Sequence, residues 1–386
     1  MTSKTGRTSK HRKAVIAGVG HTAFGKLEGR TAWHLEAEAA AAALADAGLR
    51  PADIDGLLTD PGPTQGIVDG ITPHFARLGA QLGLDPDYTG SEILGGAGSV
   101  AIIERAALAV EAGLCGVCLC VYGDSPSTNA DAYHYGRGDE AAFGFFGAVG
   151  LHALAAQRHM HRYGTSSEQL GEVAVAARAH AARTPHAQKR EPISMQDYRA
   201  SEPLVEPLRK LDCCLVSDGA AAVIVTTEQR AADLRRPAIR ILSHAQAHSL
   251  STYASPDHFD TLPAARCGPK ALGQAGLTPT DVDVVLLYDC FTIVVLLQLE
   301  DYGFCAKGES GPFVEGGRIG PGGPLPVNPS GGLLSEGYGG GMLHVIEAVR
   351  QLRGEAGQRQ VADAETALVS GHGLGMNTHA TLVLGS

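Results

Sequence analysis

The sequence lacks any run of about 18 consecutive apolar residues, the length at which a helix can span a bilayer, so we expect no transmembrane helix. It also lacks an excess of positive charge, because 31 Lys and Arg stand against 41 Asp and Glu and the formal net charge is −10. This balance argues against general affinity for nucleic acid or an anionic membrane. Residues 1–13 are rich in Ser, Thr, Lys and Arg and contain no apolar stretch, which predicts a disordered tail and not a signal peptide.

Cysteine is sparse for a chain of this length: there are eight in 386 residues. Several lie in apolar, strand-like runs, where a cysteine behaves as a small hydrophobic residue. The simplest interpretation is a protein of the reducing cytoplasm. Cys115 and Cys118 have the spacing of a redox pair, but on a strand their side chains would point to opposite faces, so we expect both to be structural.

Apolar, strand-like segments alternate with alanine-rich, helical segments along most of the chain. The expected strands are residues 15–20, 54–59, 116–122 and 219–226. The expected helices are residues 31–47 and 98–112, which end at Gly48 and Gly113. This alternation predicts an α/β layered fold with largely parallel strands. Residues 124–210 are instead rich in His, Arg and Tyr and interrupted by Pro, which predicts helices and loops laid over the layered core.

An internal repeat decides the expected architecture. Residues 43–55 and 271–283 are identical at eight of thirteen positions at an offset of 228, and both copies spell a helix, a Gly cap, a Pro turn and a strand. A weaker similarity at an offset of 243 relates residues 98–104 to 341–347. The chain is therefore expected to be two copies of one α/β half, with a shared site where they meet. We assign the first half to residues 14–123 and 211–232, an inserted loop domain to 124–210, and the second half to 233–386.

Four segments carry a resemblance to a known family: residues 19–25 (VGHTAFG), 211–221 (LDCCLVSDGAA), 288–291 (YDCF) and 326–332 (PVNPSGG). With the duplicated halves and the inserted segment, they resemble the thiolase superfamily, in the branch of the sterol-carrier-protein thiolases, over residues 14–386. The resemblance implies the thiolase fold, a layered αβαβα core with an inserted loop domain. It also implies that the last two segments surround the active site.

The departures from the thiolase pattern are concentrated at the expected site. Gly95 stands where thiolases have their nucleophilic Cys, in the segment Gly95-Gly96-Ala97-Gly98-Ser99-Val100-Ala101. Tyr288 and Tyr338 stand where relatives have His, and Ser370 stands at the second thiolase Cys. Because a thiolase holds its acyl group covalently on Cys, Gly95 excludes that route at this position.

This set of replacements resembles a narrower group, the thiolase-like aldolases of bacterial steroid side-chain degradation. That resemblance implies a carbon–carbon lyase that cleaves a β-hydroxyacyl-CoA by retro-aldol chemistry to a ketone and a shortened acyl-CoA such as propionyl-CoA. It implies no cofactor, since CoA is part of the substrate. It further implies a homodimer and an OB-fold partner associated with an enoyl-CoA hydratase.

A retro-aldol reaction needs a base for the β-hydroxyl proton, a means of holding the enolate, and an acid for the α-carbon. Tyr288 and Tyr338 are the candidates for base and acid, in either order, and His372 or Asp289 could shift their pKa values. Backbone N–H groups in glycine-rich loops can form an oxyanion hole worth about 2.7–4 kcal/mol per donor. The candidate glycines are Gly95, Gly96, Gly371 and Gly373.

Alternative functions stay open at this point. Cys290, next to the tyrosine loop, could be the nucleophile of a thiolase-type acyltransferase, or the chain could be a non-catalytic scaffold subunit. Tyr288 could be a packing residue at a strand end. A Schiff-base aldolase is disfavoured because no Lys lies in these motifs. We expect no metal site, since neither His159 with His161 nor His244 with His248 forms a specific metal signature.

Overall fold

The structure is a computed structural model and describes residues 12–66, 68–69, 71–129, 142, 144, 147–249 and 259–386. Most of the expected 1–13 tail therefore lies outside the described residues. Within the described part of the chain, no helix is both long enough and apolar enough to cross a bilayer.

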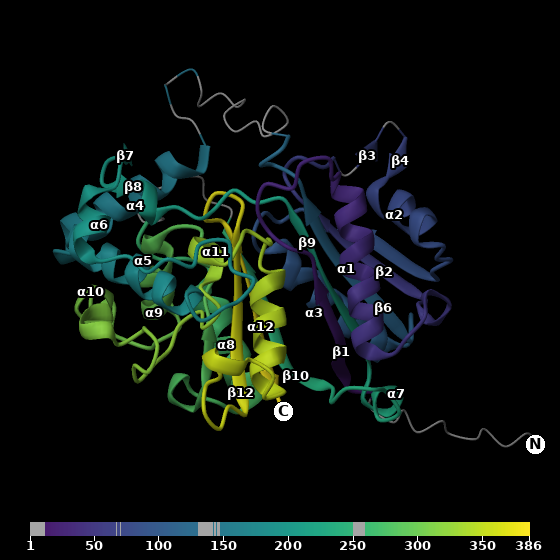
Figure 1. Ribbon diagram of the computed structural model, residues 1–386. Helices are drawn as coiled ribbons and strands as arrows, with labels where there is room; N and C mark the ends of the chain where they lie inside the picture. The colour runs from purple at the N-terminus through teal and green to yellow at the C-terminus, as the bar shows by residue number, and fades with distance from the viewer. Residues whose placement is uncertain are drawn as a thin grey trace, which may run out of the picture.

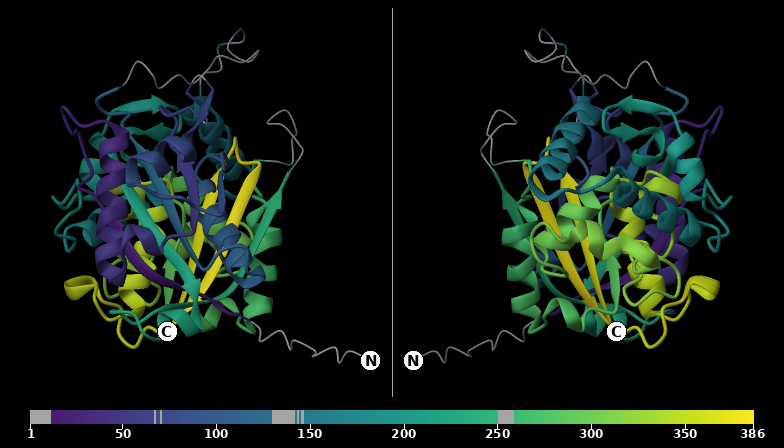
Figure 2. Two further views of the ribbon diagram at one scale, coloured as in Figure 1. Left: turned by 90° about the vertical axis from the view of Figure 1, so that its right-hand side faces the viewer. Right: turned by 90° about the vertical axis from the view of Figure 1, so that its left-hand side faces the viewer.

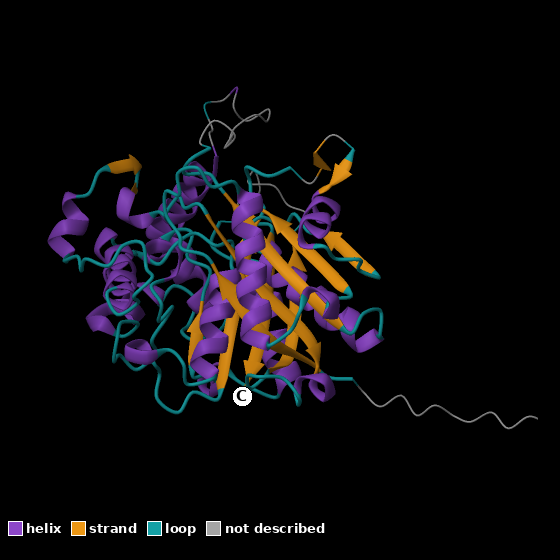
Figure 3. Ribbon diagram, turned by 45° about the vertical axis from the view of Figure 1, so that its right-hand side comes forward, coloured by secondary structure: helices purple, strands orange, loops and turns teal. Residues whose placement is uncertain are grey.

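The central feature is a nine-stranded sheet in which the two repeats follow one strand order (Figure 3). The first half contributes β1 (Ala14–His21), β9 (Gly219–Thr227), β6 (Val117–Asp124), β2 (Gly56–Pro61) and β5 (Tyr88–Ser91), in that spatial order. The second half contributes, in the corresponding order, β10 (Ile239–His248), β13 (Thr378–Gly385), β12 (Thr366–Gly373) and β11 (Val284–Leu286). A parallel bridge between Val285 and Val327 takes the place that β5 has beside β2.

The two halves are joined where β1 and β10 pair antiparallel, with Val15 opposite Arg240 and Ile16 opposite Ile239. Figure 2 shows the strands lying between helices on either side. Pairing within each half is mixed: β2 is parallel to β5 and β6, while β9 is antiparallel to β1 and β6. The expectation of largely parallel strands is therefore only partly right. The fold class itself, an α/β thiolase layout of two duplicated halves, is confirmed.

Helices complete five layers, αβαβα. Helices α3 (Gly98–Ala112) and α12 (Met342–Leu352) form the middle layer, because their buried side chains share one cluster with both parts of the sheet. Helices α1 (Ala32–Ala47) and α2 (His74–Leu82) cover the outer face of the first half, and α8 (Ala264–Ala275) and α9 (Thr292–Asp301) cover that of the second (Figure 1). The expected Gly ends are confirmed, since Gly48 and Gly113 both have positive φ.

The inserted segment follows β6 of the first half but packs over the second half, beside α9 (Figure 1). It contains α4 (Gly147–Tyr163), α5 (Ser167–Ala181), α6 (Met195–Ala200), β7 (Pro203–Val205) and β8 (Leu208–Arg209). The remaining short elements are β3 (Val68–Asp69), β4 (Thr72–Pro73), α7 (Glu228–Ala231), α10 (Ser310–Val314) and α11 (Gly332–Ser335). The insertion thus brings α4 next to the ends of the second-half strands.

The expected geometry of Cys115 and Cys118 is wrong. Cys115 precedes β6, so the two residues do not follow strand alternation, and a Cβ added at Gly56 would lie 2.9 Å from the sulfur of Cys115 and 3.1 Å from that of Cys118. Both cysteines are buried as free thiols, which agrees with a structural role.

Candidate active site

A cavity of about 1250 Å³ opens between the two halves and the inserted segment. Its walls come from the end of β2, the loop before α3, the loop before α12, the end of β12 and the start of α4. Its volume exceeds that of most small-ligand pockets, which are about 300–1,000 Å³. Of the predicted site residues, it is lined by Gly95, Gly96, Tyr288, Cys290, Tyr338, His372 and Gly373.

The two predicted tyrosines meet in this cavity, although 50 residues separate them in the sequence. Tyr288 follows β11, Tyr338 lies in the loop before α12, and their hydroxyl oxygens are 2.9 Å apart. In such a pair one hydroxyl donates its proton to the oxygen of the other. The donating oxygen keeps free lone pairs that can accept from a further donor, and the accepting hydroxyl keeps its own proton to donate. The pair can therefore accept a proton on one side and donate one on the other.

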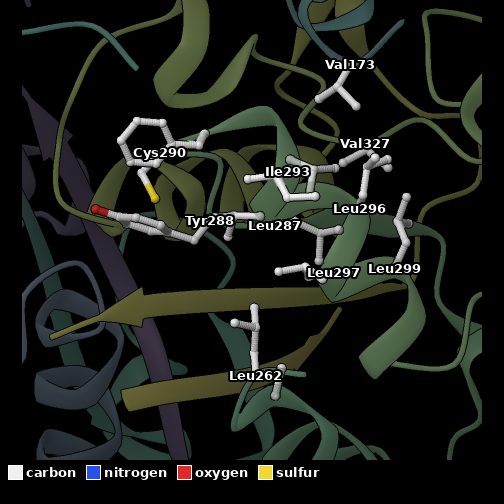
Figure 4. Packing of buried hydrophobic residues seen from close by; sticks show 14 of the residues in the cluster. Val173, Leu262, Leu287, Tyr288, Cys290, Ile293, Leu296, Leu297, Leu299 and Val327 are labelled. Carbon is white, nitrogen blue, oxygen red and sulfur yellow. The ribbon is translucent and has the colours of Figure 1, made fainter. Parts of the chain in front are cut away.

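Tyr288 is a neutral phenol at ordinary pH. Its side chain is 2% exposed, and burial raises its pKa well above the usual value, with Tyr338 and Cys290 adding to the rise. Figure 4 shows its ring pointing away from the aliphatic cluster that contains Leu287 and Leu297. Proton transfer through Tyr288 must therefore be coupled to the less buried Tyr338.

The backbone of Tyr288 is held by two side chains. Its N–H donates to Ser370 Oγ at 2.8 Å, and its carbonyl accepts from Gln298 Nε2 at 2.8 Å. Ser370 Oγ in turn donates to Gln298 Oε1 at 2.5 Å. Ser370, at the second thiolase Cys position, thus positions the tyrosine and does not line the cavity. Gln298 was missed from the sequence because it lies on α9, in an apolar helix without a site motif.

The glycines of the loop before α3 make room for the tyrosine. A Cβ added at Gly96 would lie 2.0 Å from both Cζ and Oη of Tyr288, so only Gly fits there. Gly95 has a φ of 55°, in the left-handed region that favours Gly. The loop can therefore pack closely around the tyrosine, and the expectation that Gly95 stands at the position of the thiolase Cys stays a prediction.

Gly371 and Gly373 allow β12 to pack tightly against the same loop. A Cβ at Gly371 would lie 2.9 Å from Ala97 Cα, and one at Gly373 would lie 1.9 Å from the carbonyl oxygen of Leu94. Gly373 lines the cavity, whereas Gly371 is not among its lining residues. The proposal that these glycines supply oxyanion-hole donors stays a prediction.

His372 and Cys290 are brought together with a residue that the sequence did not single out, His152 of α4. The two imidazole Nε2 atoms are 3.4 Å apart, and Cys290 Sγ lies 4.0 Å from His152 Nε2. Burial lowers the pKa of His152 to about 4, and its Nδ1 bonds the Ala148 carbonyl at 2.7 Å. Imidazole nitrogen and cysteine sulfur are donors of the type that holds Zn²⁺. Among the described residues, His152, Cys290 and His372 are the group of potential metal ligands.

Cys290 is poorly suited to act as a nucleophile. Burial raises its pKa well above the usual value, and the neighbouring Cys214 and Asp289 raise it further. The thiolate is the reactive form, so this site keeps the residue in its unreactive thiol form.

Asp289 is directed away from the tyrosine pair. Its carboxylate accepts from the backbone N–H groups of Leu333 at 2.8 Å and Leu334 at 3.3 Å, at the start of α11, and lies 3.2 Å from His344 Nε2. It is fully buried and is not among the residues that line the large cavity. These contacts give it a structural role in joining the two site loops; its assistance to the tyrosines stays a prediction.

Comparisons with known proteins agree with this geometry. The family model "Thiolase C-terminal domain-like" matches residues 245–386. A steroid side-chain-cleaving aldolase from Thermomonospora curvata is 36% identical, covering 97% of this chain and 98% of the relative. The 17-hydroxy-3-oxo-4-pregnene-20-carboxyl-CoA lyase of Mycobacterium tuberculosis is 38% identical, covering 97% and 99%. The chain belongs to the thiolase superfamily.

Solved structures place it within that superfamily. The "Ltp2-ChsH2(DUF35) aldolase" matches with a TM-score of 0.87 and 36% identity, over 97% of this chain and 98% of the other. Human mitochondrial 3-ketoacyl-CoA thiolase matches with a TM-score of 0.72 and 17% identity, over 97% and 99%, which shows the shared fold. Among thiolase-fold proteins, this chain therefore groups with CoA-thioester lyases.

One further residue at the cavity was missed from the sequence. Asp60, the fifth residue of β2, is buried and lines the cavity, and Ser99 Oγ donates to its Oδ2 at 2.7 Å. A signal for it was present, because Asp60 precedes Tyr288 by the repeat offset of 228.

Proposed function

We propose that this protein is an acyl-CoA aldolase, a carbon–carbon lyase that cleaves a β-hydroxyacyl-CoA to a ketone and a shortened acyl-CoA. The observation that carries the proposal is the hydrogen-bonded pair of Tyr288 and Tyr338 in a large cavity. Gly95 also lines this cavity, at the position that the resemblance gives to the thiolase nucleophile. The lyase names of the relatives at 36–38% identity support it.

The reaction needs two proton transfers and the movement of one electron pair. A base takes the proton of the β-hydroxyl, the C–O bond becomes a ketone, and the Cα–Cβ bond breaks. The electron pair of that bond goes to the α-carbon and is delocalised onto the thioester oxygen as an enolate. A proton then adds to the α-carbon to give the shortened acyl-CoA.

The tyrosine pair fits the first part of this sequence. The oxygen that keeps free lone pairs can take the hydroxyl proton while the proton of that tyrosine passes to its neighbour, whose own proton passes to the thioester oxygen as negative charge develops there. Both tyrosines end the step as neutral phenols, and the enolate is released in its neutral enol form. Loop N–H groups near Gly95, Gly96 and Gly373 are the further candidates for that oxygen.

We further propose a steroid side-chain thioester as substrate, with propionyl-CoA as the shortened product. The names of both relatives refer to steroid side chains or to a pregnene carboxyl-CoA. A cavity of about 1250 Å³ suits a bulky tertiary alcohol better than a short acyl chain. CoA enters as part of the substrate, and no separate cofactor is proposed.

The similar aldolase structure pairs Ltp2 with ChsH2(DUF35), and we propose an equivalent partner for this chain. On the resemblance to the steroid side-chain aldolases, it would be an OB-fold module associated with an enoyl-CoA hydratase, bound to a homodimer of this chain. We place the protein in the cytoplasm, where its free cysteines would stay reduced.

The test is incubation of the chain, with and without a DUF35-type partner, with 17-hydroxy-3-oxo-4-pregnene-20-carboxyl-CoA, followed by mass spectrometry of products and protein. Release of the 17-ketosteroid and propionyl-CoA supports the aldolase. An acyl adduct on Cys290 would instead support an acyltransferase. No turnover with the partner present would leave the scaffold function as the better account.

A further inference from the structure

Asp60 and Tyr288 occupy equivalent positions in the two halves. They are separated by the repeat offset of 228, and β2 and β11, the strands that lead to them, hold corresponding places in the sheet. Both residues line the same cavity. The fold therefore brings one oxygen acid from each half to the site that the halves share.

The glycines before α3 show how near the two groups are. A Cβ at Gly96 would lie 2.0 Å from the hydroxyl oxygen of Tyr288, and one at Gly98 would lie 2.4 Å from Oδ1 of Asp60. Two residues span at most about 7 Å between Cα atoms. Tyr288 and Asp60 thus contact opposite ends of one short loop, within reach of a single bound thioester.

The hydrogen-bond partner of Asp60 lies beside the loop that carries the other tyrosine. Ser99, which donates to Asp60 Oδ2, has its Oγ 3.0 Å from the position of a Cβ added at Gly340, in the loop that carries Tyr338. Among the described residues, the Asp60 carboxyl accepts a hydrogen bond from Ser99 at Oδ2. Its Oδ1 is therefore available to a molecule in the cavity.

The surroundings keep this carboxyl protonated. Asp60 is 4% exposed and forms no ion pair within the part of the chain that the structure describes. Burial raises its pKa to about 8, and the nearby carboxylates of Asp124 and Glu92 add to the rise. At neutral pH it is an acid with a proton to give, placed beside apolar and glycine-rich walls.

We propose that Asp60 is the catalytic acid that protonates the α-carbon of the enol. The inference rests on the proposed aldolase function. The Asp60 O–H bond breaks, and its proton forms the new Cα–H bond with the electron pair of the enol. The thioester carbonyl is restored as the enol oxygen releases the proton that it took from the tyrosine pair, and that proton returns through water to the Asp60 carboxylate. Both tyrosines remain neutral phenols throughout.

The test compares Asp60→Asn with Asp301→Asn in the complex with the DUF35-type partner. The amide introduced by Asp60→Asn keeps an acceptor for Ser99 but has no acidic proton. Asp301 is a buried carboxyl at the end of α9 that accepts from the N–H of Leu262 and from Lys307 and does not line the cavity. We expect Asp60→Asn to lower turnover at least about 100-fold, as for loss of a general acid. Asp301→Asn should stay within about threefold of wild type.

A stereochemical readout separates catalysis from a merely structural effect. In D₂O, a positioned acid adds deuterium to one face of the enolate, so wild type should give a single enantiomer of α-deuterated propionyl-CoA. Asp60→Asn should give a mixture, because solvent can reach either face. Wild-type turnover in Asp60→Asn, or a slow variant that still gives one enantiomer, would overturn the proposal.

A partial reaction tests the role of Asp60 separately from the proposed aldolase function. Exchange of the α-hydrogens of propionyl-CoA with D₂O needs enolate formation but no carbon–carbon cleavage. If wild type exchanges without cleaving the steroid thioester, the aldolase proposal fails and Asp60 is still judged by the loss of exchange in Asp60→Asn. Equal exchange in wild type and variant, or none in wild type, counts against Asp60.

Discussion

Replacing Gly96 with Ala should stop catalysis by displacing the hydroxyl of Tyr288. The added Cβ would lie 2.0 Å from Cζ and Oη of that ring, whereas favourable carbon contacts are about 3.5–4.0 Å. The ring would have to move by roughly 1.5 Å. It has little room to do so, because Tyr288 is 2% exposed and its backbone is held by Ser370 and Gln298.

The size of the effect follows from the Tyr288–Tyr338 hydrogen bond. A displacement of that size would lengthen the 2.9 Å contact between the hydroxyls beyond hydrogen-bonding distance. Loss of a positioned acid–base group costs about 10²–10⁴ in rate. The added Cβ would also lie 2.5 Å from the backbone oxygen of His372, so β12 must shift as well as the ring. Overpacking typically costs about 1–3 kcal/mol of the free energy of unfolding, and urea unfolding shows whether the variant folds. We therefore expect turnover to fall at least about 100-fold in a folded protein.

The assay is steady-state cleavage of the steroid thioester, with urea unfolding of the same preparations. Gly273→Ala on α8 is the matched control, because no atom lies within 4 Å of its added Cβ, and it should keep wild-type turnover and gain up to about 1 kcal/mol of stability. Gly96→Ala should add little to the rate loss of Tyr288→Phe, since both remove one hydroxyl from one place. Wild-type turnover in Gly96→Ala would show that the position of the Tyr288 hydroxyl does not control catalysis.

Three other changes test the site. Tyr288→Phe and Tyr338→Phe should each lower turnover by about 10²-fold or more with folding intact, as judged by kinetics and thermal unfolding; unchanged rates in both would remove the proposed chemistry. Cys290→Ala should keep most turnover, because burial holds the thiol protonated by raising its pKa; complete loss, with an acyl adduct on the wild-type thiol, would contradict this. The pKa of Asp60 is near 4 in the unfolded chain and about 8 in the folded protein. Between these two pH values only the folded state keeps the proton, so the free energy of unfolding falls as pH rises, by roughly 5 kcal/mol in all. Asp60→Asn should lack this fall in urea unfolding from pH 4 to 8, and parallel curves for variant and wild type would show that the carboxyl is not buried and neutral.

Much of the fold could be predicted because its pattern occurs twice in the sequence. The repeated helix, Gly cap and Pro turn at residues 43–55 and 271–283 predicted two equal halves, and both halves have the same strand order. Such signals are local: positive φ favours Gly, and apolar periodicity reports the buried face of an element. The mixed direction of the strands was not predicted in this way, because β9 returns to the sheet only after the long inserted segment, and β13 pairs antiparallel with β12 through a short connection.

At the site, the sequence predicted Gly95 and the two tyrosines as residues of one site, because each stands inside a recognisable motif, and all three line the cavity. It could not show that their hydroxyls lie 2.9 Å apart, nor that Asp289 bonds the start of α11 and faces away from them. It could not place His152, which reaches His372 across 220 residues through the inserted segment.

The architecture and the prediction of Gly95, Tyr288 and Tyr338 as site residues thus came from the sequence alone, since these depend on residue type and local pattern. Only the tertiary structure decided which polar groups share the cavity and in which protonation state. Burial and neighbouring charge set the pKa of Asp60 and Tyr288, and both arise from residues far away in the chain. The acid from the first half and the tyrosines from the second form one site because the packed halves bring the ends of β2 and β11 to one cavity.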